Sequence, residues 1–251
     1  MEVELRHPRT GRRNANPSDV GDRLTGTVVQ RLDRVGKFLL GQLDSGLTWV
    51  THLGMSGRVL VTGRDEPEVP HTHFITRTDA GDDVRLVDPR TFGFVAVFTP
   101  EELESQLHLG RDALSDLPRS PQLSAKLAGR TAPIKSLLLD QRIVAGLGNI
   151  YADEVLHRAR VRPTRPAGEL TTSEVSLLRG AIKPVLQAGI AAGGTSLGDL
   201  AYLLPDGQAG DYLRRLRVYG REGLPCRRCG SGIERVVVGG RSSFFCPNCQ
   251  L

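Results

Sequence analysis

Cys226-Arg-Arg-Cys229 and Cys246-Pro-Asn-Cys249, two short motifs separated by 16 residues, decide how the end of this 251-residue chain folds. They contain all four cysteines of the sequence. Each Cys-x2-Cys pair can point two thiolates at one tetrahedral ion, and this spacing is typical of a zinc ribbon. The sequence therefore predicts one structural Zn²⁺ with the ligands Cys226, Cys229, Cys246 and Cys249. The alternative is a pair of disulfides, which we do not expect in a chain without a secretory signal.

Between the two motifs, residues 235–238 and 243–245 have the composition of two strands joined by a glycine turn. A four-cysteine site leaves no open metal position, so the ribbon is expected to stabilise a small segment and not to catalyse a reaction. Arg241 follows the turn directly. It is either a probe at an exposed hairpin tip or a solvated surface charge.

The net charge of +5 is concentrated around the same ribbon. Residues 211–251 hold eight arginines and three acidic residues, which accounts for the whole surplus. Of the 33 basic residues only four are lysines, and arginine forks suit phosphate groups, although genome composition also produces such a bias. No stretch of 18 apolar residues occurs, so we expect no membrane span. Because the cysteines are expected to be reduced and no targeting signal opens the sequence, we expect a soluble, cytoplasmic protein.

The first hundred residues show the short alternating runs of a β domain, either a sandwich or a barrel. The expected strands are residues 25–32, 37–43, 47–53, 58–62, 73–78, 84–87 and 92–98. A stretch rich in Pro and Ser at residues 115–121 then marks a domain boundary. The predicted domains are residues 1–117, 118–210 and 211–251.

Beyond this boundary the apolar residues follow a helical period. Thr171-x-x-Glu174 is a capping box that opens a long helix, in which Pro184 is expected to cause a kink. Residues 134–144 and 150–158 are expected to form two helices, with a Gly-rich turn between them. Asn149 is predicted at the N-cap of the second helix, where unpaired N–H groups can face a phosphate.

Several longer motifs, in the same order along the chain, resemble one family, the bacterial formamidopyrimidine-DNA glycosylases. They are His52-Leu-Gly-Met-Ser-Gly57, Asp88-Pro-Arg-Thr-Phe-Gly93, Lys135-Ser-Leu-Leu-Leu-Asp-Gln141, Val144-Ala-Gly-Leu-Gly-Asn-Ile-Tyr-Ala-Asp-Glu154, Gly193-Gly-Thr-Ser-Leu197 and Val218-Tyr-Gly-Arg-Glu-Gly223, together with the four-cysteine finger. The resemblance implies a multidomain α and β fold with an N-terminal β-sandwich, a helix-two-turn-helix domain and a C-terminal zinc ribbon. It also implies a monomer that repairs oxidised purines in double-stranded DNA.

A damaged base in a duplex is out of reach until it is flipped out, and the gap in the stack then needs a filler. The family positions that fill this gap carry Met55, Arg90 and Phe92 here, although composition alone would place Met55 and Phe92 in a core. By the same resemblance His71, Arg130 and Asn149 contact phosphates, with Lys135 as a further candidate. Residues 197–210 match the loop that closes over the flipped base.

Family chains begin with Pro-Glu after the initiator Met and continue into a helix, and the reaction uses the N-terminal amine as a nucleophile. This sequence begins Met1-Glu-Val-Glu-Leu5, which resembles the strand after that helix. Lys37 matches a lysine that assists the lyase step, or else it contacts phosphate. To serve as the nucleophile itself, Lys37 would need burial that depresses its pKa by about two to three units.

Three hypotheses follow. In the first, the start site is placed too late and the protein is a glycosylase and lyase, with Lys37 assisting the first elimination and Arg241 the second. In the second, it is a shortened paralogue that binds damaged or distorted DNA without cutting it. In the third, it is a zinc-ribbon nucleic-acid adaptor without lesion preference.

Overall fold

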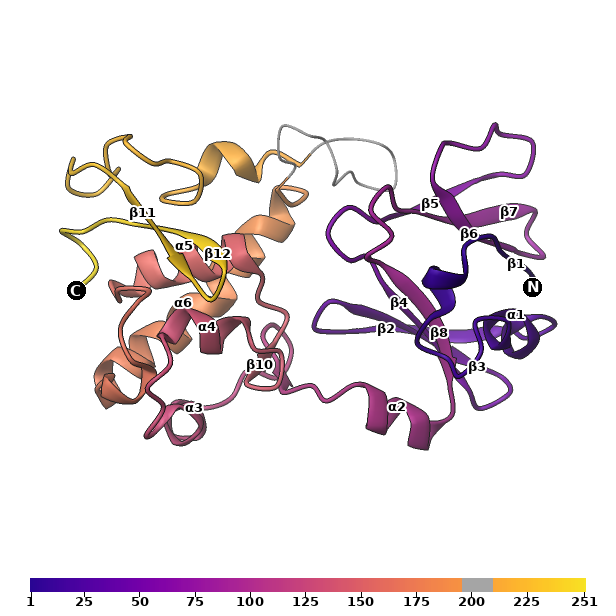
Figure 1. Cartoon of the computed structure of the whole chain (residues 1–251), viewed down its shortest axis with the longest axis horizontal. Coiled ribbons are helices and arrows are strands. Elements are labelled where there is room, and N and C mark those ends of the chain that lie inside the picture. The colour runs from indigo at the N-terminus through magenta and orange to yellow at the C-terminus, as the bar shows by residue number, and fades with distance from the viewer. Residues whose placement is uncertain (196–209) are drawn as a thin grey trace. The chain divides into compact units, whose positions relative to one another are not determined.

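The computed structural model describes residues 1–195 and 210–251. The chain divides into two compact units, one of residues 1–108 with 195–210 and the other of residues 109–194 with 211–251 (Figure 1). The loop expected to close over a flipped base, residues 197–210, lies outside the described residues except for Gly210. Among the helices of the described residues, none has the length and apolar character needed to cross a membrane.

Unit 1 is a sandwich of two four-stranded antiparallel sheets. The first sheet has the strand order β1 (Glu2–Leu5), β6 (Thr72–Arg77), β7 (Asp82–Val87) and β5 (Arg58–Gly63). The second has the order β2 (Val29–Val35), β3 (Phe38–Leu43), β4 (Thr48–His52) and β8 (Phe94–Phe98). The prediction of a β-sandwich is confirmed.

Strand β8 is buried on both faces, and its side chains alternate between two clusters. Val95 and Val97 join the core between the sheets, with Phe74 of the opposite sheet. Phe94, Ala96 and Phe98 point to the other face, where residues of α2 (Pro100–Gln106) pack against them. The helices α1 (Asp19–Leu24) and α2 were not predicted, although Thr99 and Glu102 form a capping box that would have indicated α2.

The predicted strands match the observed ones within a few residues, with one larger difference. The strand expected at residues 25–32 begins only at Val29, because Thr25 terminates α1 and its N–H donates to the carbonyl of Gly21. The residues up to Val28 are used in the turn that leads from this helix into β2.

Unit 2 is helical around one apolar core. Its main elements are the helices α3 (Ser120–Leu127), α4 (Ile134–Leu139), α5 (Asn149–Ala159) and α6 (Thr172–Ala191), with the short strands β9 (Arg111–Asp112) and β10 (Val144–Ala145). The predicted capping box of Thr171 and Glu174 opens α6. This helix runs from Thr172 to Ala191 through Pro184 without interruption.

The first predicted helix of this unit is shorter than expected. It ends at Leu139 because Asp140 leaves the helical conformation, and its carboxylate accepts from the backbone N–H of Arg142 at 3.0 Å. Val144 and Ala145 then pair in parallel with β9 instead of continuing the helix. The N-cap of α5 is Gly148, and Asn149 is the first helical residue, so the N-cap prediction for Asn149 is wrong by one position.

The C-terminal hairpin consists of β11 (Glu234–Val238) and β12 (Arg241–Phe245), as predicted. Gly239 and Gly240 both have positive φ and form the turn. The short 3₁₀ helix η3 (Tyr212–Arg215) leads into this segment. The small core beneath it contains Val218 and Ile233 with two of the cysteines.

Candidate functional site

Met55 lies on a tight turn between β4 and β5. Gly54, at φ 65°, starts the turn, and the N–H of Gly57 donates to the carbonyl of Leu53 at 2.8 Å. Met55 is 66% exposed, which excludes the core position that its composition suggested. His52 supports the turn, because its Nδ1 accepts from the N–H of Gly54 at 3.0 Å. Burial, together with the charges of Lys37, Arg12 and Arg13, lowers the pKa of His52 to about 4, so this nitrogen stays an acceptor near neutral pH.

Arg90 and Phe92 lie on the loop between β7 and β8. Phe92 is 39% exposed, and the guanidinium carbon of Arg90 lies 4.7 Å from the centroid of its ring. This is a cation–π distance, and it presents the two side chains as one stacked pair. Thr91 between them has φ 53°, a conformation that β-branched residues rarely adopt.

The Met55 turn and the Arg90–Phe92 loop are in backbone contact. A Cβ added to Gly54 would lie 2.5 Å from the nitrogen of Gly93 and 2.6 Å from the carbonyl carbon of Phe92. Only glycine allows this approach. The three residues predicted to fill a gap in a base stack are therefore displayed by two adjoining turns of unit 1.

His71 and Lys37 also belong to unit 1 and are exposed. His71 has φ 68° just before β6, and its carbonyl accepts from the N–H of Asp88 at 3.0 Å. Lys37 lies in the turn between β2 and β3, close enough for its charge to act on His52. Because Lys37 is exposed, the described structure does not provide the burial that a lysine nucleophile requires.

The structure gives Lys135 a different place from the predicted phosphate contact. Its side chain is fully buried, and its Nζ lies 2.8 Å from a carboxylate oxygen of Asp153 on α5. Nζ also donates to the carbonyl of Ser242 at 2.8 Å. Burial lowers the pKa of Lys135 and raises that of Asp153, while the contact between them opposes both shifts. An ammonium enclosed in this way cannot reach a phosphate, and Lys135 instead joins α4, α5 and the hairpin.

Asn149 and Arg130 are the other predicted phosphate contacts of unit 2. The Nδ2 of Asn149 donates to the carbonyl of Ser242 at 3.1 Å, so this side chain also touches the hairpin. Its Oδ1 is buried and has no hydrogen-bond partner among the described residues. Arg130 is exposed and follows Gly129, which has φ 69°. Arg142 lowers the pKa of Asp140, and the charge of Arg130 adds a smaller effect in the same direction.

Two acidic residues of α5 fix the C-terminal segment to the helical domain, and no pattern in the sequence singled them out. The carboxylate of Glu154 accepts from the backbone N–H groups of Arg217, Val218 and Tyr219 at 2.9–3.0 Å. Asp153 accepts from the hydroxyl of Ser243 at 2.8 Å and from the N–H of Phe244 at 2.9 Å. The hairpin is therefore bound to the helix that begins at Asn149.

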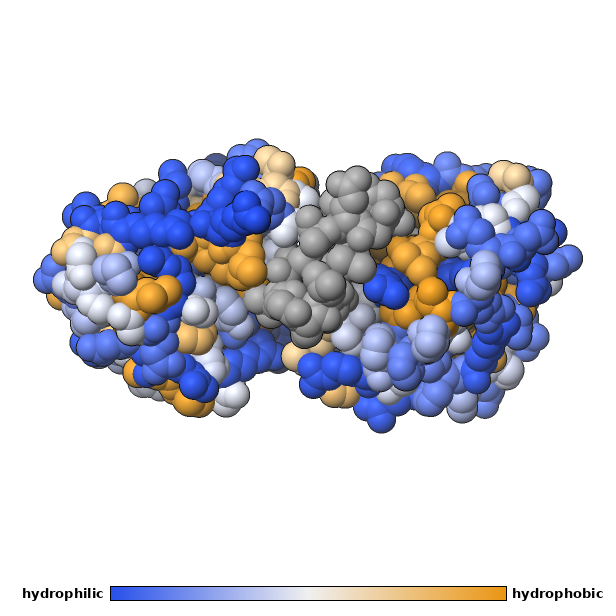
Figure 2. Space-filling model, turned by 90° about the horizontal axis from the view of Figure 1, so that it is seen from above, coloured by the Kyte–Doolittle hydropathy of each residue, from blue (hydrophilic) through white to orange (hydrophobic). Residues whose placement is uncertain are grey.

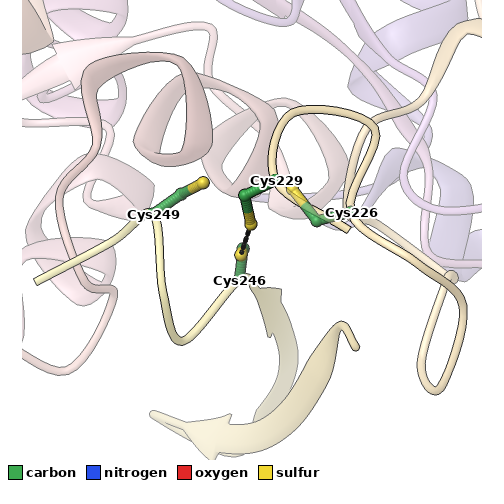
Figure 3. A group of neighbouring side chains, drawn as sticks. All are labelled: Cys226, Cys229, Cys246 and Cys249. Atoms are coloured by element: carbon green, nitrogen blue, oxygen red, sulfur yellow. Dashed lines mark hydrogen bonds between the residues drawn. The ribbon is translucent and has the colours of Figure 1, made fainter. Parts of the chain in front are cut away.

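The four cysteines converge at the base of this hairpin (Figure 3). Their sulfur atoms all lie within 4.8 Å of one another, and the Sγ atoms of Cys229 and Cys246 are 3.4 Å apart. A disulfide needs about 2.05 Å, whereas tetrahedral Zn²⁺ with bonds of about 2.3 Å separates its sulfurs by about 3.8 Å. All four cysteines are free of disulfides.

The pKa values of two of these thiols are shifted in opposite directions. Hydrogen bonds from Ser231 and Asn248 lower the pKa of Cys229 to about 5, whereas burial and the neighbouring Cys229 and Cys246 raise that of Cys249 to about 12. Four thiolates at such distances require a positive ion between them. The Nε2 of His157 on α5 lies 3.6 Å from the Sγ of Cys226, so this residue contacts a predicted ligand without being one of the four.

Arg241 is exposed at the start of β12, directly after the glycine turn, in agreement with the predicted hairpin tip. The tip lies against α4, because a Cβ on Gly239 would be 3.2 Å from the hydroxyl of Ser136. Figure 2 shows extensive hydrophilic surface on the half of the molecule that holds this hairpin. A sandwich, a helical domain and a basic four-cysteine finger together define a class of multidomain DNA-binding proteins.

Comparisons with known proteins identify the family. Residues 1–95 match the model of the formamidopyrimidine-DNA glycosylase N-terminal domain, residues 109–200 that of the H2TH domain of the same enzymes, and residues 223–251 the zinc finger found in FPG and IleRS. The chain belongs to the formamidopyrimidine-DNA glycosylase family. The predicted family, fold class and single structural Zn²⁺ are thereby confirmed.

Individual relatives cover nearly the whole chain. The formamidopyrimidine-DNA glycosylase of Gluconobacter oxydans is 44% identical over 241 residues, covering 93% of this chain and 86% of the relative. The crystal structure of the MutM (FPG) protein from Thermus thermophilus is 40% identical, with a TM-score of 0.87 over 99% of this chain and 90% of that one. The Lactococcus lactis Fpg in complex with DNA containing an abasic site is 31% identical, with a TM-score of 0.89 over 99% and 91%.

Proposed function

We propose that this protein acts in base excision repair by recognising oxidised purines, such as 8-oxoguanine and formamidopyrimidine, in double-stranded DNA and flipping them out of the stack. The observation that carries the proposal is the exposure of Met55 and Phe92 on two turns in contact, with Arg90 stacked on Phe92. A flexible apolar side chain, an aromatic ring and a forked donor suit the gap that an extruded base leaves. A relative of known structure supports it, since the Lactococcus lactis Fpg was solved with abasic-site DNA and with Fapy-dG DNA.

The roles of the polar residues form a second part of the proposal. His71, Arg130 and Asn149 contact phosphates, and Arg241 at the hairpin tip probes the lesion strand. Such contacts set the register of a protein on the duplex and make binding depend on salt. Lys135 is not included, because it is enclosed by Asp153 and Ser242.

Cleavage is proposed for a chain that carries the N-terminal Pro-Glu of the family, with Lys37 assisting the first elimination and Arg241 the second. The attacking amine displaces the damaged base from C1′ by breaking the glycosidic bond, and opening of the sugar ring then gives a Schiff base, which borohydride reduces to a permanent link. We expect borohydride to trap a covalent complex on 8-oxoguanine DNA when the extended chain is used. If no complex forms with the extended chain, the protein recognises the lesion without cutting it.

The recognition step is tested by the affinity for two duplexes, one undamaged and one with a tetrahydrofuran abasic-site analogue opposite cytosine. We expect Met55→Ala and Phe92→Ala each to lower affinity for the analogue about tenfold, because base–aromatic and apolar stacking contributes about 1–3 kcal/mol per base. Val61→Ala is the matched control, since Val61 is 55% exposed on β5 of the same unit. A zinc-ribbon adaptor without lesion preference would bind both duplexes equally and tolerate both substitutions.

We propose that the protein works as a monomer in the bacterial cytoplasm, at the nucleoid, and that residues 1–117, 118–210 and 211–251 are its domains. The contacts of Asp153 and Glu154 imply that the third domain folds onto the second and does not move freely from it.

A further inference from the structure

We propose that Asp88 and Arg12 are positioning residues which fix the Met55 turn and the Arg90–Phe92 loop in the arrangement that enters damaged DNA. The inference rests on the proposed function, in which these two turns fill the gap of a flipped base. Neither residue needs to touch DNA in this role. Together they determine how strongly the protein distinguishes damaged from undamaged duplex.

Asp88 joins the two turns from inside the protein. It is 2% exposed, and one carboxylate oxygen accepts from the hydroxyl of Ser56, next to Met55, at 2.6 Å. The same oxygen accepts from the N–H of Arg90 at 3.3 Å, and the other oxygen accepts from the N–H of Gly93 at 2.6 Å. One buried carboxylate therefore receives donors from both turns, and such bonds are about twice as strong as those between neutral groups.

Arg12 binds the outer side of the same loop through its carbonyl groups. Its guanidinium donates to the carbonyl of Phe92 at 2.8 Å, to that of Gly93 at 2.7 Å and to that of Arg9 at 2.6 Å. Arg9 in turn donates to the carbonyl of Thr91 at 3.1 Å. The carboxylate of Asp88 thus accepts from two N–H groups of the loop. Arg9 and Arg12 donate to three successive carbonyls, those of residues 91–93.

The loop needs this support because its conformation is unfavourable by itself. Thr91, with φ 53°, lies between the two side chains that are displayed, and a β-branched residue in this region is strained. A free loop would leave that conformation and turn Arg90 and Phe92 away from Met55. Fixing it before DNA binds removes an ordering cost that would otherwise reduce the affinity for the lesion.

An arginine near a DNA-binding surface has an obvious alternative role as a phosphate contact. The two roles differ in what they change. A phosphate contact raises affinity for every duplex and adds about one to the salt dependence, whereas a positioning residue acts only where the turns enter the stack. The hydrogen bonds of Arg12 to three carbonyls also need the planar fork, which a lysine does not have.

The test compares wild type with Arg12→Lys and Ser56→Ala, and uses Arg13→Lys as the matched control. Arg13 is the neighbouring arginine and lies 5.3 Å from the ring of Phe94, but none of the hydrogen bonds described for this loop involves it. Binding of a tetrahydrofuran duplex and of an undamaged duplex is measured by fluorescence anisotropy over a series of salt concentrations. We expect Arg12→Lys and Ser56→Ala to reduce the ratio of the two affinities about tenfold, with unchanged affinity and salt slope on undamaged DNA and no effect of Arg13→Lys.

A pair of Asp88 variants separates positioning from simple stability. Asp88→Asn keeps an acceptor for the N–H of Gly93 and can donate to Ser56, and it loses only the longer bond from the N–H of Arg90. It is therefore expected to retain the ratio within about threefold, whereas Asp88→Ala loses it. Melting temperatures show whether each variant is folded. The inference is overturned if folded variants keep the wild-type ratio, or if both affinities fall together and the salt slope drops by about one. If wild type itself has no preference for the tetrahydrofuran duplex, the proposed function fails first.

Discussion

Replacing Lys135 by Met tests whether this residue is a buried ion-pair partner, as the structure places it, or a phosphate contact, as its sequence motif implied. Methionine has a similar length and no charge. It would leave the carboxylate of Asp153 buried, with the hydroxyl of Ser243 and the N–H of Phe244 as its remaining donors. It would also remove one of the two donors to the carbonyl of Ser242, leaving Asn149 as the other.

The magnitude follows from the burial of both partners. Breaking a buried pair by removing one member costs about 3–5 kcal/mol, because a charge stays behind without compensation. Asp153 can limit this loss by taking up a proton. For a carboxyl with an ordinary pKa near 3.9, neutralisation at pH 7 costs about 4 kcal/mol at about 1.4 kcal/mol per pH unit. We therefore expect a loss of about 4 kcal/mol in the free energy of unfolding, or roughly 8–16 °C in melting temperature.

The stability of the Lys135→Met variant should depend on pH. In the variant the pKa of folded Asp153 is raised above its unfolded value, so protonation stabilises the folded state and the benefit is lost as pH rises. The gap in melting temperature between wild type and Lys135→Met should accordingly narrow as pH falls from 7 to 5. Asp153→Asn added to Lys135→Met removes the stranded charge and should recover part of the stability at pH 7.

The assay is thermal unfolding of the zinc-loaded protein, combined with DNA affinity as a function of salt. Lys183→Met is the matched control, because Lys183 is an exposed lysine on α6 of the same unit. The reasoning is refuted if Lys135→Met unfolds within about 1 kcal/mol of wild type. A lower salt slope without a lower melting temperature would restore the phosphate-contact interpretation.

Other substitutions and conditions test the remaining parts of the site. His52→Asn keeps an acceptor for the N–H of Gly54 but cannot titrate. Because the pKa of His52 is lowered to about 4 in the folded protein, wild type loses stability as pH falls through 6.5 and below. The melting temperature of wild type should therefore drop more than that of His52→Asn between pH 7 and 5. Gly54→Ala should reduce the preference for a tetrahydrofuran duplex at least about tenfold in binding assays, because its Cβ would meet the nitrogen of Gly93 at 2.5 Å; equal preference in the two proteins would contradict the contact between the turns. Removing Zn²⁺ with a chelator should lower the melting temperature of the protein and abolish binding of both the tetrahydrofuran duplex and undamaged DNA. Readdition of Zn²⁺ should restore the melting temperature and the binding. Binding that persists without the metal would show that DNA binding does not require the finger.

Features that depend on neighbours in the sequence were predictable from it. The zinc ligands follow from two Cys-x2-Cys motifs, and the strands from alternation over a few residues, because both are set by local spacing. The capping box of Thr171 identified the start of α6 for the same reason. The errors also have local causes: the helix at residues 134–144 stops early because Asp140 binds the N–H of Arg142, which periodicity does not reveal.

Contacts between distant segments could not be predicted in this way. The carbonyl of Ser242 accepts from Lys135 and Asn149, which precede it by 107 and 93 residues, so the chemistry of all three depends on how the hairpin docks on α4 and α5. A lysine in a DNA-binding motif has two roles open to it, and only the position of a partner such as Asp153 decides between them. Met55 is a different case: composition alone would place this apolar residue in a core, whereas the motif around it predicted a residue that fills the gap in a base stack, and the structure exposes it.

These long-range contacts also connect the zinc site to the proposed phosphate contacts. Three residues of the helix that begins at Asn149 contact the C-terminal segment. Asp153 binds Phe244 of β12, and Glu154 binds Val218 before the first cysteine motif. His157 lies beside the Sγ of Cys226. A closed zinc site does no chemistry, yet its loss would release the partners of two buried carboxylates on this helix. The start of α5 and the Arg241 tip would then lose their common support, so we propose that the finger affects DNA binding through the helical domain as well as through Arg241.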